Sequence, residues 1–230
     1  MKKFSKKYQA AIAKVEKGKV YSLDEAIALA KETSITKFDA SVDISFNLNV
    51  NPTLADQLIR GTISLPHGTG KEKKVLVVTN TKLDDAKNSG AEYFGGKEML
   101  EKIQTQNWFD FDVIIATPDM MGELGKMGRL LGPKGLMPNP KTGTVTMDVK
   151  TAVAEIKKGK IAYRVDRHGN LSMGVGRVSF TPEMLSDNLK AITDQIVKSR
   201  PSTVKGTFIN NVVISTTMGP AIAITFPGRN

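Results

Sequence analysis

One short segment has the residue types of a phosphate-binding loop. Residues 68–71, Gly-Thr-Gly-Lys, could surround a nucleotide phosphate with backbone N–H groups and a lysine. The full motif also requires a glycine five residues before Gly70, where this chain has Leu65, and a Ser or Thr after the lysine, where it has Glu72. A crossing between two domains needs flexible glycines and no ligand. The segment therefore favours an interdomain hinge at Gly68 and Gly70, and a nucleotide-dependent enzyme remains the alternative hypothesis.

Groups that could bind a metal or act as a nucleophile are few. The chain has no cysteine and only two histidines, which excludes disulfides, thiolate chemistry and a cysteine- or histidine-based zinc site. Asp110, Asp112 and Asp119 flank one apolar run, but neither a histidine nor a cluster of glutamates accompanies them, so solvated strand ends explain them better than a carboxylate site. We therefore expect no catalytic residue, no metal and no cofactor.

A basic turn offers groups that can contact phosphates. Arg164, Arg167 and His168 lie within five residues of one another, with Asp166 and Gly169 between and beside them. Arginine side chains are among the groups with which proteins contact the phosphates of nucleic acids. His168 fits contact with RNA and a merely solvated turn about equally well.

A second polar surface consists of small side chains. Between Ala40 and Val50, apolar residues alternate with Ser, Asp and Asn, which predicts a strand with one buried face and one polar face. Residues 216–220, Thr-Thr-Met-Gly-Pro, add two hydroxyls, a soft apolar side chain and a glycine that allows close approach. Such hydroxyl and amide groups both donate and accept hydrogen bonds and can approach the sugar edges of RNA. By chemistry alone, a solvated sheet face remains the alternative.

A third candidate lies in a segment rich in Gly and Pro. Residues 125–128, Gly-Lys-Met-Gly, resemble the GXXG loop that clamps nucleic-acid backbone in KH domains, and the Gly/Pro-rich sequence continues to Pro138. A structured surface loop is the first expectation for this composition, with a secondary RNA contact as the alternative.

The elements that must position these groups fall into two styles. Alternating strands are expected at 40–50, at 161–175 as a hairpin, and around 208–215 and 221–226. Helices with one apolar face are expected at 8–15, after the capping-box pair Ser22 and Glu25, and after Thr181-Pro182. Between them, 75–79 and 113–117 are unbroken apolar runs, typical of parallel strands buried on both faces. Helices are expected around these runs at 83–89, 97–104, 120–131 and 148–158.

This change of style predicts one domain interrupted by another. Residues 1–67 and 160–230 form a discontinuous α+β domain, and 68–159 form an inserted α/β domain whose second crossing contains a further hinge glycine, Gly159. The outer segments carry 19 Lys+Arg and 11 Asp+Glu, a net +8, whereas the middle segment carries 14 and 12, a net +2. A polyanionic partner is therefore expected mainly at the discontinuous domain. No apolar run approaches the length of a membrane span, so we expect no membrane contact.

Several of these segments also resemble signatures of the L-one family of large-subunit ribosomal proteins, in the family's order and over roughly residues 20–230. They are 37–42 (Lys-Phe-Asp-Ala-Ser-Val), 60–62 with 65–70, 127–140 (the Gly/Pro-rich segment), 163–166 (Tyr-Arg-Val-Asp) and 215–220 (Ser-Thr-Thr-Met-Gly-Pro). One departure is Val165, since bacterial relatives often have Asn there. This leaves a polar contact at that position in doubt.

The resemblance implies a split β-α-β RNA-binding domain of two layers, interrupted by a Rossmann-like domain of three layers that binds no dinucleotide. It implies a cytoplasmic structural ribosomal protein, monomeric when free, without enzymatic activity or cofactor. The implied partners are large-subunit ribosomal RNA at the mobile stalk, exit-site tRNA whose release it assists, and the mRNA of its own operon, which it represses. The implied RNA-binding residues are Lys37, Phe38, Ser41, Arg164, Asp166, Arg167, His168, Gly169, Thr216, Thr217, Met218 and Gly219.

Overall fold

The computed structural model describes residues 4–226, and these pack into two compact units. Unit 1 contains the described residues up to Gly70 together with those from Ile161 onward, and unit 2 is Lys71–Lys160. The chain is a mixture of helices and strands throughout, as the sequence predicts. Within the described residues, no helix is long and apolar enough to cross a membrane.

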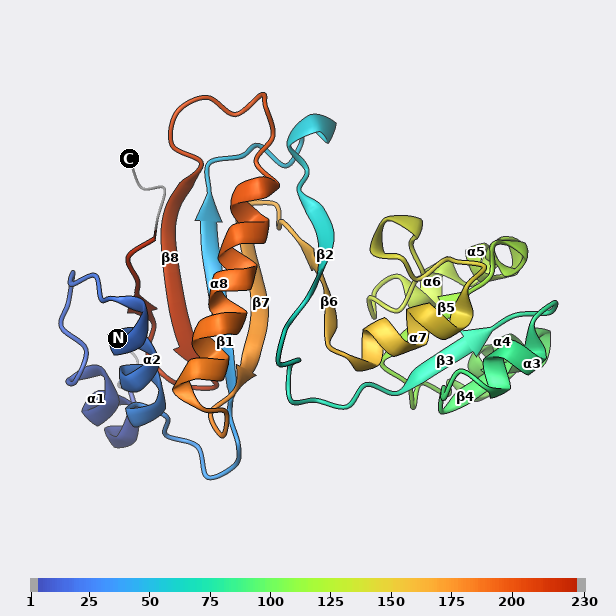
Figure 1. Cartoon of the computed structure of the whole chain (residues 1–230), viewed down its shortest axis with the longest axis horizontal. Helices are drawn as coiled ribbons and strands as arrows, with labels where there is room; N and C mark the ends of the chain where they lie inside the picture. Colours follow the sequence, from blue (N-terminus) through green and yellow to red (C-terminus); the bar gives the residue numbers. More distant parts are fainter. Residues whose placement is uncertain (1–3, 227–230) are drawn as a thin grey trace. The chain divides into compact units, whose positions relative to one another are not determined.

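Unit 1 is built on a four-stranded antiparallel sheet with the strand order β7-β1-β8-β9 (Figure 1). A separate two-stranded sheet pairs β2 with β6. The elements of this part of the chain are α1 (Lys6–Ile12), α2 (Leu23–Glu32), β1 (Ser41–Leu48), η1 (Ala55–Gln57), β2 (Arg60–Ser64), β6 (Lys160–Arg164), β7 (Asn170–Arg177), α8 (Pro182–Lys198), β8 (Ile209–Thr216) and β9 (Ile222–Ala223).

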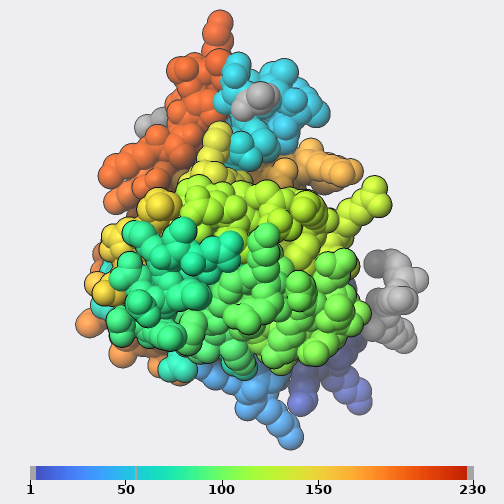
Figure 2. Space-filling view, turned by 90° about the vertical axis from the view of Figure 1, so that its right-hand side faces the viewer, coloured from blue at the N-terminus to red at the C-terminus, as the bar shows by residue number. Residues whose placement is uncertain are grey.

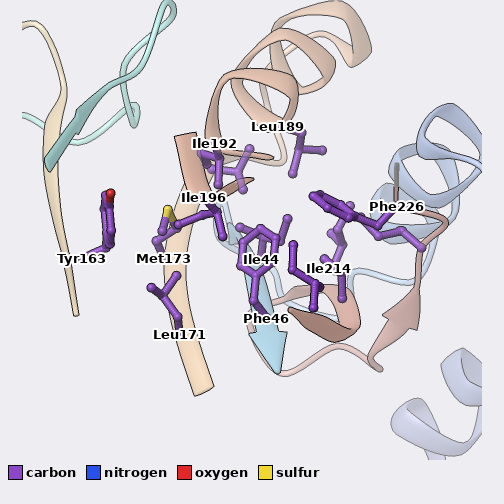
Figure 3. Close-up of a cluster of buried hydrophobic side chains, with 14 of the residues drawn as sticks. Ile44, Phe46, Tyr163, Leu171, Met173, Leu189, Ile192, Ile196, Ile214 and Phe226 are labelled. Carbon is purple, nitrogen blue, oxygen red and sulfur yellow. The ribbon is translucent and has the colours of Figure 1, made fainter. Parts of the chain in front are cut away.

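The core of unit 1 lies between this sheet and its helices. Every second residue of β1 is buried, and α8 has a buried stripe of Leu185, Leu189, Ile192 and Ile196. Figure 3 shows Leu189, Ile192 and Ile196 on the side of α8 that faces the sheet. The ring of Phe46 meets that of Phe226 edge to face, with 6.1 Å between centroids. Burying one such side chain contributes about 1.5–3 kcal/mol, so this face of β1 holds the unit together.

Local sequence signals explain where the main helices begin. Ser22 and Glu25 form both hydrogen bonds of a capping box at the start of α2, and the Thr181 side chain accepts from the Met184 N–H at the start of α8. These predictions are confirmed. The helix expected at 8–15 is shorter, because α1 already ends at Ile12.

The hairpin expected at 161–175 is wrong. The strands β6 and β7 do not pair with each other: β6 pairs with β2 and β7 pairs with β1. The Val165 N–H donates to the Ile59 carbonyl (3.0 Å), so the chain follows the β2 side until the turn begins. The period of two in the sequence shows which face of each strand is buried, but it does not say which neighbour completes the hydrogen bonds.

Unit 2 contains a three-stranded parallel sheet in the order β4-β3-β5, as expected for its unbroken apolar runs. One apolar cluster on this sheet includes Leu76 and Ile114, and a second on the other face includes Val77 and Ile115. Helices therefore cover both faces. The elements are β3 (Val75–Val78), α3 (Leu83–Lys87), β4 (Tyr93–Gly95), α4 (Lys97–Gln106), β5 (Val113–Ala116), η2 (Pro118–Met120), α5 (Met121–Lys126), α6 (Gly128–Leu131), η3 (Pro140–Thr142) and α7 (Val149–Lys157).

Two features of unit 2 differ from the sequence-based expectation. The short strand β4 was not foreseen, since only three residues form it and two glycines end the run. The helix expected at 120–131 is divided into η2, α5 and α6. Glycines at 122, 125 and 128 lower helix propensity there, and Met127 adopts a non-helical ψ of 7° between α5 and α6.

The first crossing between the units is held to unit 1 as far as Gly70. The fully buried Asn188 side chain accepts from the His67 N–H (3.1 Å) and donates to the carbonyls of Gly68 (3.0 Å) and Val175 (2.8 Å). Gly70 has a left-handed φ of 69°, and a Cβ there would lie 2.8 Å from the Arg177 side chain. The loop is therefore bound to its own unit and is not open to surround a phosphate.

From Lys71 the chain is held to unit 2. The Asp112 carboxylate accepts from the Lys74 N–H (3.1 Å) and from Lys71 Nζ (3.3 Å). Burial alone would raise the pKa of Asp112, but these hydrogen bonds outweigh burial and lower it. At the second crossing, Gly159 ends α7 with a φ of 99°.

We predict that Asn188→Ala lowers the free energy of unfolding of unit 1 by about 2–3 kcal/mol, because it leaves one backbone N–H and two carbonyls without partners. Loss of circular dichroism in urea measures the unfolding of both units together. The one tryptophan, Trp108, lies in unit 2 and reports on that unit by fluorescence. The fluorescence transition should stay unchanged. Lys190→Ala replaces an exposed residue on the same helix and should shift neither unfolding transition. If both substitutions lowered the free energy of unfolding equally, the hydrogen bonds of Asn188 would not have this stabilising role.

Candidate nucleic-acid interface

The predicted RNA-binding residues of unit 1 divide into two groups at opposite ends of the central strand β1. We call them the Ser41 end, with Lys37, Phe38, Ser41 and residues 216–219, and the Gly169 end, with Arg164 and residues 166–169. Ser41 begins β1, and the Leu48 N–H at its other end donates to the Gly169 carbonyl (2.9 Å). Eight residues of extended strand separate the groups by ~23 Å. The sheet brings each group together but does not merge them.

At the Ser41 end, Thr217 fastens the turn to the first residue of β1. Its N–H donates to the Ser41 carbonyl (3.1 Å), and its Oγ1 accepts from the Ser41 N–H (3.1 Å). The Thr217 hydroxyl is thus used inside the protein. The neighbouring Thr216 is buried, and a Cβ on Gly219 would lie 2.2 Å from its Oγ1. Only glycine fits at 219, and the Thr216 side chain is covered rather than presented to a ligand.

Met218 is the most unusual residue at this end. Its φ is +62°, the left-handed region that costs a side-chain-bearing residue about 1–2 kcal/mol. Its side chain is nevertheless 70% exposed, so no packing within unit 1 offsets the strain. Phe38 precedes β1 by three residues and is 61% exposed. A strained backbone that presents an apolar side chain to solvent indicates a surface shaped for a partner.

Between the two ends runs a strip of small polar side chains on the outer face of the sheet. Ser45 Oγ is hydrogen-bonded to Ser172 Oγ (2.8 Å), and the Asn47 amide donates to Asn170 (2.8 Å) and accepts from Asn210 (3.0 Å). These bonds between neighbouring strands fix the side chains in place. The strip therefore offers a pre-organised surface without long flexible side chains.

One residue of the strip, Asp43, was not singled out from the sequence. It lies between Gly174 of β7 and Ser215 of β8, and among the described residues its carboxylate accepts no hydrogen bond and makes no ion pair. Burial raises its pKa. A half-buried carboxylate here repels phosphates, but it can accept hydrogen bonds from ribose hydroxyls or base amino groups. As the one charge within an alternating run of Ser and Asn, it could have been noticed in the sequence.

At the Gly169 end, two of the predicted residues shape the turn. The Asp166 carboxylate accepts from the backbone N–H groups of Asn170 (2.7 Å) and His168 (2.8 Å), which lowers the pKa of Asp166. A Cβ on Gly169 would lie 2.7 Å from the Leu48 carbonyl oxygen, and the φ of Gly169 is 79°. Both residues are thus required by the local structure.

The remaining residues of this end are exposed arginines and one exposed histidine. The side chains of Arg164, Arg167 and His168 face solvent, as does Arg60, which follows the Ile59 that pairs with Val165. Arg60 was not among the predicted RNA-binding residues, although it lies in the segment 60–62 that resembles the family signature. Val165 is buried in the core, so it makes no polar contact with a partner.

The other candidates from the sequence do not form a reactive site. Asp110 accepts from the Trp108 indole (2.9 Å), Asp112 binds the chain at Lys74, and Asp119 accepts from the Thr81 hydroxyl (3.4 Å). Each carboxylate has its own structural partner. Over the described range 4–226, no group of three or more His, Cys, Asp or Glu side chains is placed to hold a metal ion.

The sequence is similar to those of known ribosomal proteins over most of its length. Residues 30–220 match the model of the Ribosomal protein L1p/L10e family. The chain is 55% identical to the large ribosomal subunit protein uL1 of Mycoplasma capricolum, over 98% of this chain and all of that protein. It is 58% identical to the protein of the same name from Mesoplasma florum, over 97% of this chain and 99% of that one. The chain belongs to the Ribosomal protein L1p/L10e family.

Proposed function

We propose that this protein is a structural component of the large ribosomal subunit that binds the subunit's ribosomal RNA through unit 1. The observation that carries the proposal is the exposed, conformationally strained Met218, which lies with exposed Phe38 at the Ser41 end of a pre-organised polar strip. The names of the relatives support it. Since the family is one of ribosomal proteins and not of enzymes, the nucleotide-dependent alternative is set aside.

The chemistry of unit 1 suits RNA in two ways. The strip and the Ser41 end present hydroxyls, amides and two apolar side chains, which fit ribose edges and unstacked bases. The Gly169 end presents arginines, which fit phosphates. The outer segments also hold most of the net positive charge, +8 of +10. Shape and hydrogen bonding at one end are thus combined with charge at the other.

The proposal includes finer points that rest on the family resemblance. The protein would lie at the mobile stalk near the tRNA exit site, assist release of deacylated tRNA, and repress its own operon by binding a similar fold in the mRNA. We also propose that residues 1–67 with 160–230 act as the RNA-binding domain and 68–159 as an inserted domain, with Gly68, Gly70 and Gly159 flanking the hinge. Competition between the operon mRNA and ribosomal RNA for one binding site on the protein tests the repressor role.

Met218→Gly should separate binding from folding. Glycine adopts a positive φ without strain, so the free protein should gain up to about 1 kcal/mol of unfolding free energy. The same change removes the exposed side chain and should weaken binding of large-subunit ribosomal RNA by roughly 1–3 kcal/mol. Urea denaturation and titration with RNA measure the two effects. Unchanged affinity would mean that Met218 is not a contact.

Salt dependence provides the contrast for this variant. The Met218 contact carries no charge, so the dependence of log affinity on log salt should keep its slope. Arg164→Ala and Arg167→Ala should each flatten the slope by about one unit, because each removes a phosphate contact. The control is Thr217→Ser, which keeps the hydroxyl that accepts from the Ser41 N–H. Thr217→Ala is unsuitable because loss of this hydrogen bond would also loosen the turn.

The two units should differ in binding when prepared separately. Unit 1, with its two segments joined by a short linker, has its own core and should fold and bind ribosomal RNA. Unit 2 alone should bind at least tenfold more weakly, a difference of about 1.4 kcal/mol or more. Comparable affinities of the isolated units for the same RNA would refute the assignment of the site to unit 1.

The carboxylate of Asp43 makes stability depend on pH with a defined sign. Its folded-state pKa is raised, so the stability that its protonated form contributes is present below the unfolded-state pKa and lost as pH rises through the folded-state pKa. Asp43→Asn should therefore stabilise the free protein at neutral pH, and the gain should vanish in acid. Thermal unfolding from acid to neutral pH measures this gain in stability. Weaker RNA binding by the same variant at neutral pH would identify Asp43 as a contact, whereas a gain that persists in acid would exclude the burial effect.

A further inference from the structure

The net positive charge of unit 2 comes from one segment. Residues 124–147 contain Lys126, Arg129, Lys134 and Lys141 and not a single Asp or Glu. The rest of Lys71–Lys160 carries 11 Lys+Arg against 12 Asp+Glu. Unit 2 is thus nearly neutral except for a stretch that is wholly basic. Figure 2 shows this segment, coloured yellow-green, on the solvent-facing surface of the unit.

The segment folds into a compact surface with its cations outward. The Gly132 N–H donates to the Gly128 carbonyl (2.9 Å), and the Leu136 N–H donates to the Leu131 carbonyl (3.1 Å), so the chain turns back over α6. Leu124, Met127 and Leu131 are buried beneath it. The side chains of Lys126, Arg129 and Lys134 are exposed.

Little on the chain itself neutralises these cations. Lys126 pairs with Glu123 (3.2 Å), but Glu123 is shared with Lys97 (3.5 Å), which leaves that cluster positive. Across the described residues, Arg129 and Lys134 make no ion pair. Lys134 Nζ instead lies 4.0 Å from the centroid of the Phe109 ring. The charges are therefore held at the surface and available to an external anion.

The backbone of the same surface is bare. A Cβ at Gly122, Gly125 or Gly128 would meet nothing within 4 Å, so no neighbour within the protein requires glycine there. Each glycine costs a helix roughly 1 kcal/mol relative to alanine. These positions let a partner approach the main chain between the cations. The exposed glycine backbone alone would not indicate a partner, but the cations around it indicate an anionic one.

We propose that Lys126, Arg129 and Lys134, with the bare backbone at Gly125 and Gly128, contact the sugar–phosphate backbone of a second segment of the bound RNA. The inference deepens the proposed function and rests on it. Apart from these cations, the exposed groups of 125–135 are glycines, Leu130 and Pro133, which read no base edge. The contact is therefore independent of sequence and adds to recognition by unit 1.

A charge-neutralised full-length variant tests the contact. Lys126→Gln, Arg129→Gln and Lys134→Gln together should flatten the salt dependence of binding to large-subunit ribosomal RNA by about two to three units. Affinity at low salt should fall at least threefold. The matched control is Lys87→Gln, Lys150→Gln and Lys158→Gln, which removes three exposed cations from α3, from α7 and from the residue that follows α7; both helices pack on the other face of the sheet. The same slope for both triple variants would overturn the proposal.

The absence of cysteine allows a second measurement that does not depend on affinity. Leu130→Cys places a single thiol on the basic surface for attachment of an iron chelate that cleaves nearby RNA. Lys150→Cys provides the control on the opposite face. Cleavage from position 130 and none from 150 supports the proposal, and cleavage from neither overturns it. If Met218→Gly weakens RNA binding but both triple variants keep the affinity and salt slope of the parent protein, the second contact is rejected. The proposed function would remain intact in that case.

Discussion

The arrangement of unit 1 depends on the alternation of one strand. Residues of β1 point by turns into the core and out to solvent, and both neighbours, β7 and β8, pair along its whole length. The inward set closes the core against α8. The outward set is the polar strip, and the two ends of the same strand fix both groups of candidate RNA contacts. A shift of register by one residue would bury the strip and expose the core, so stability and binding surface are specified by the same hydrogen bonds.

Much of this framework could be predicted from the residues because its causes are local. Alternation in 40–50 identified β1, the capping box identified the start of α2, and the unbroken apolar runs identified the parallel sheet. What could not be predicted has causes elsewhere in the chain. The partners of β6 and β7 depend on β1 and β2, which lie elsewhere in the sequence.

The candidate site shows the same division. Residue type drew attention to 216–219 and to the arginines, but it did not reveal what each side chain does within the protein. The Thr217 hydroxyl holds Ser41, Asp166 closes its own turn, and Val165 belongs to the core. Nothing about a methionine predicts a left-handed backbone, because the conformation is imposed by the turn around it. Asp43 acquires its unusual environment only when Gly174 and Ser215 are placed on either side.

The short crossings between the units have a consequence for how weak contacts add. Asn188 holds the chain as far as Gly68, Asp112 holds it again from Lys71, and Lys73 Nζ donates to the carbonyl of Lys160 (2.9 Å) at the other crossing. Two connecting segments, each only a few residues long, therefore join unit 2 to unit 1. If unit 1 binds RNA as proposed, any surface of unit 2 is then held near the same RNA at an effective concentration on the order of millimolar. An interaction of unit 2 that is too weak to measure in isolation then lengthens the residence time of the protein on the RNA. Each unit can still dissociate from the RNA separately.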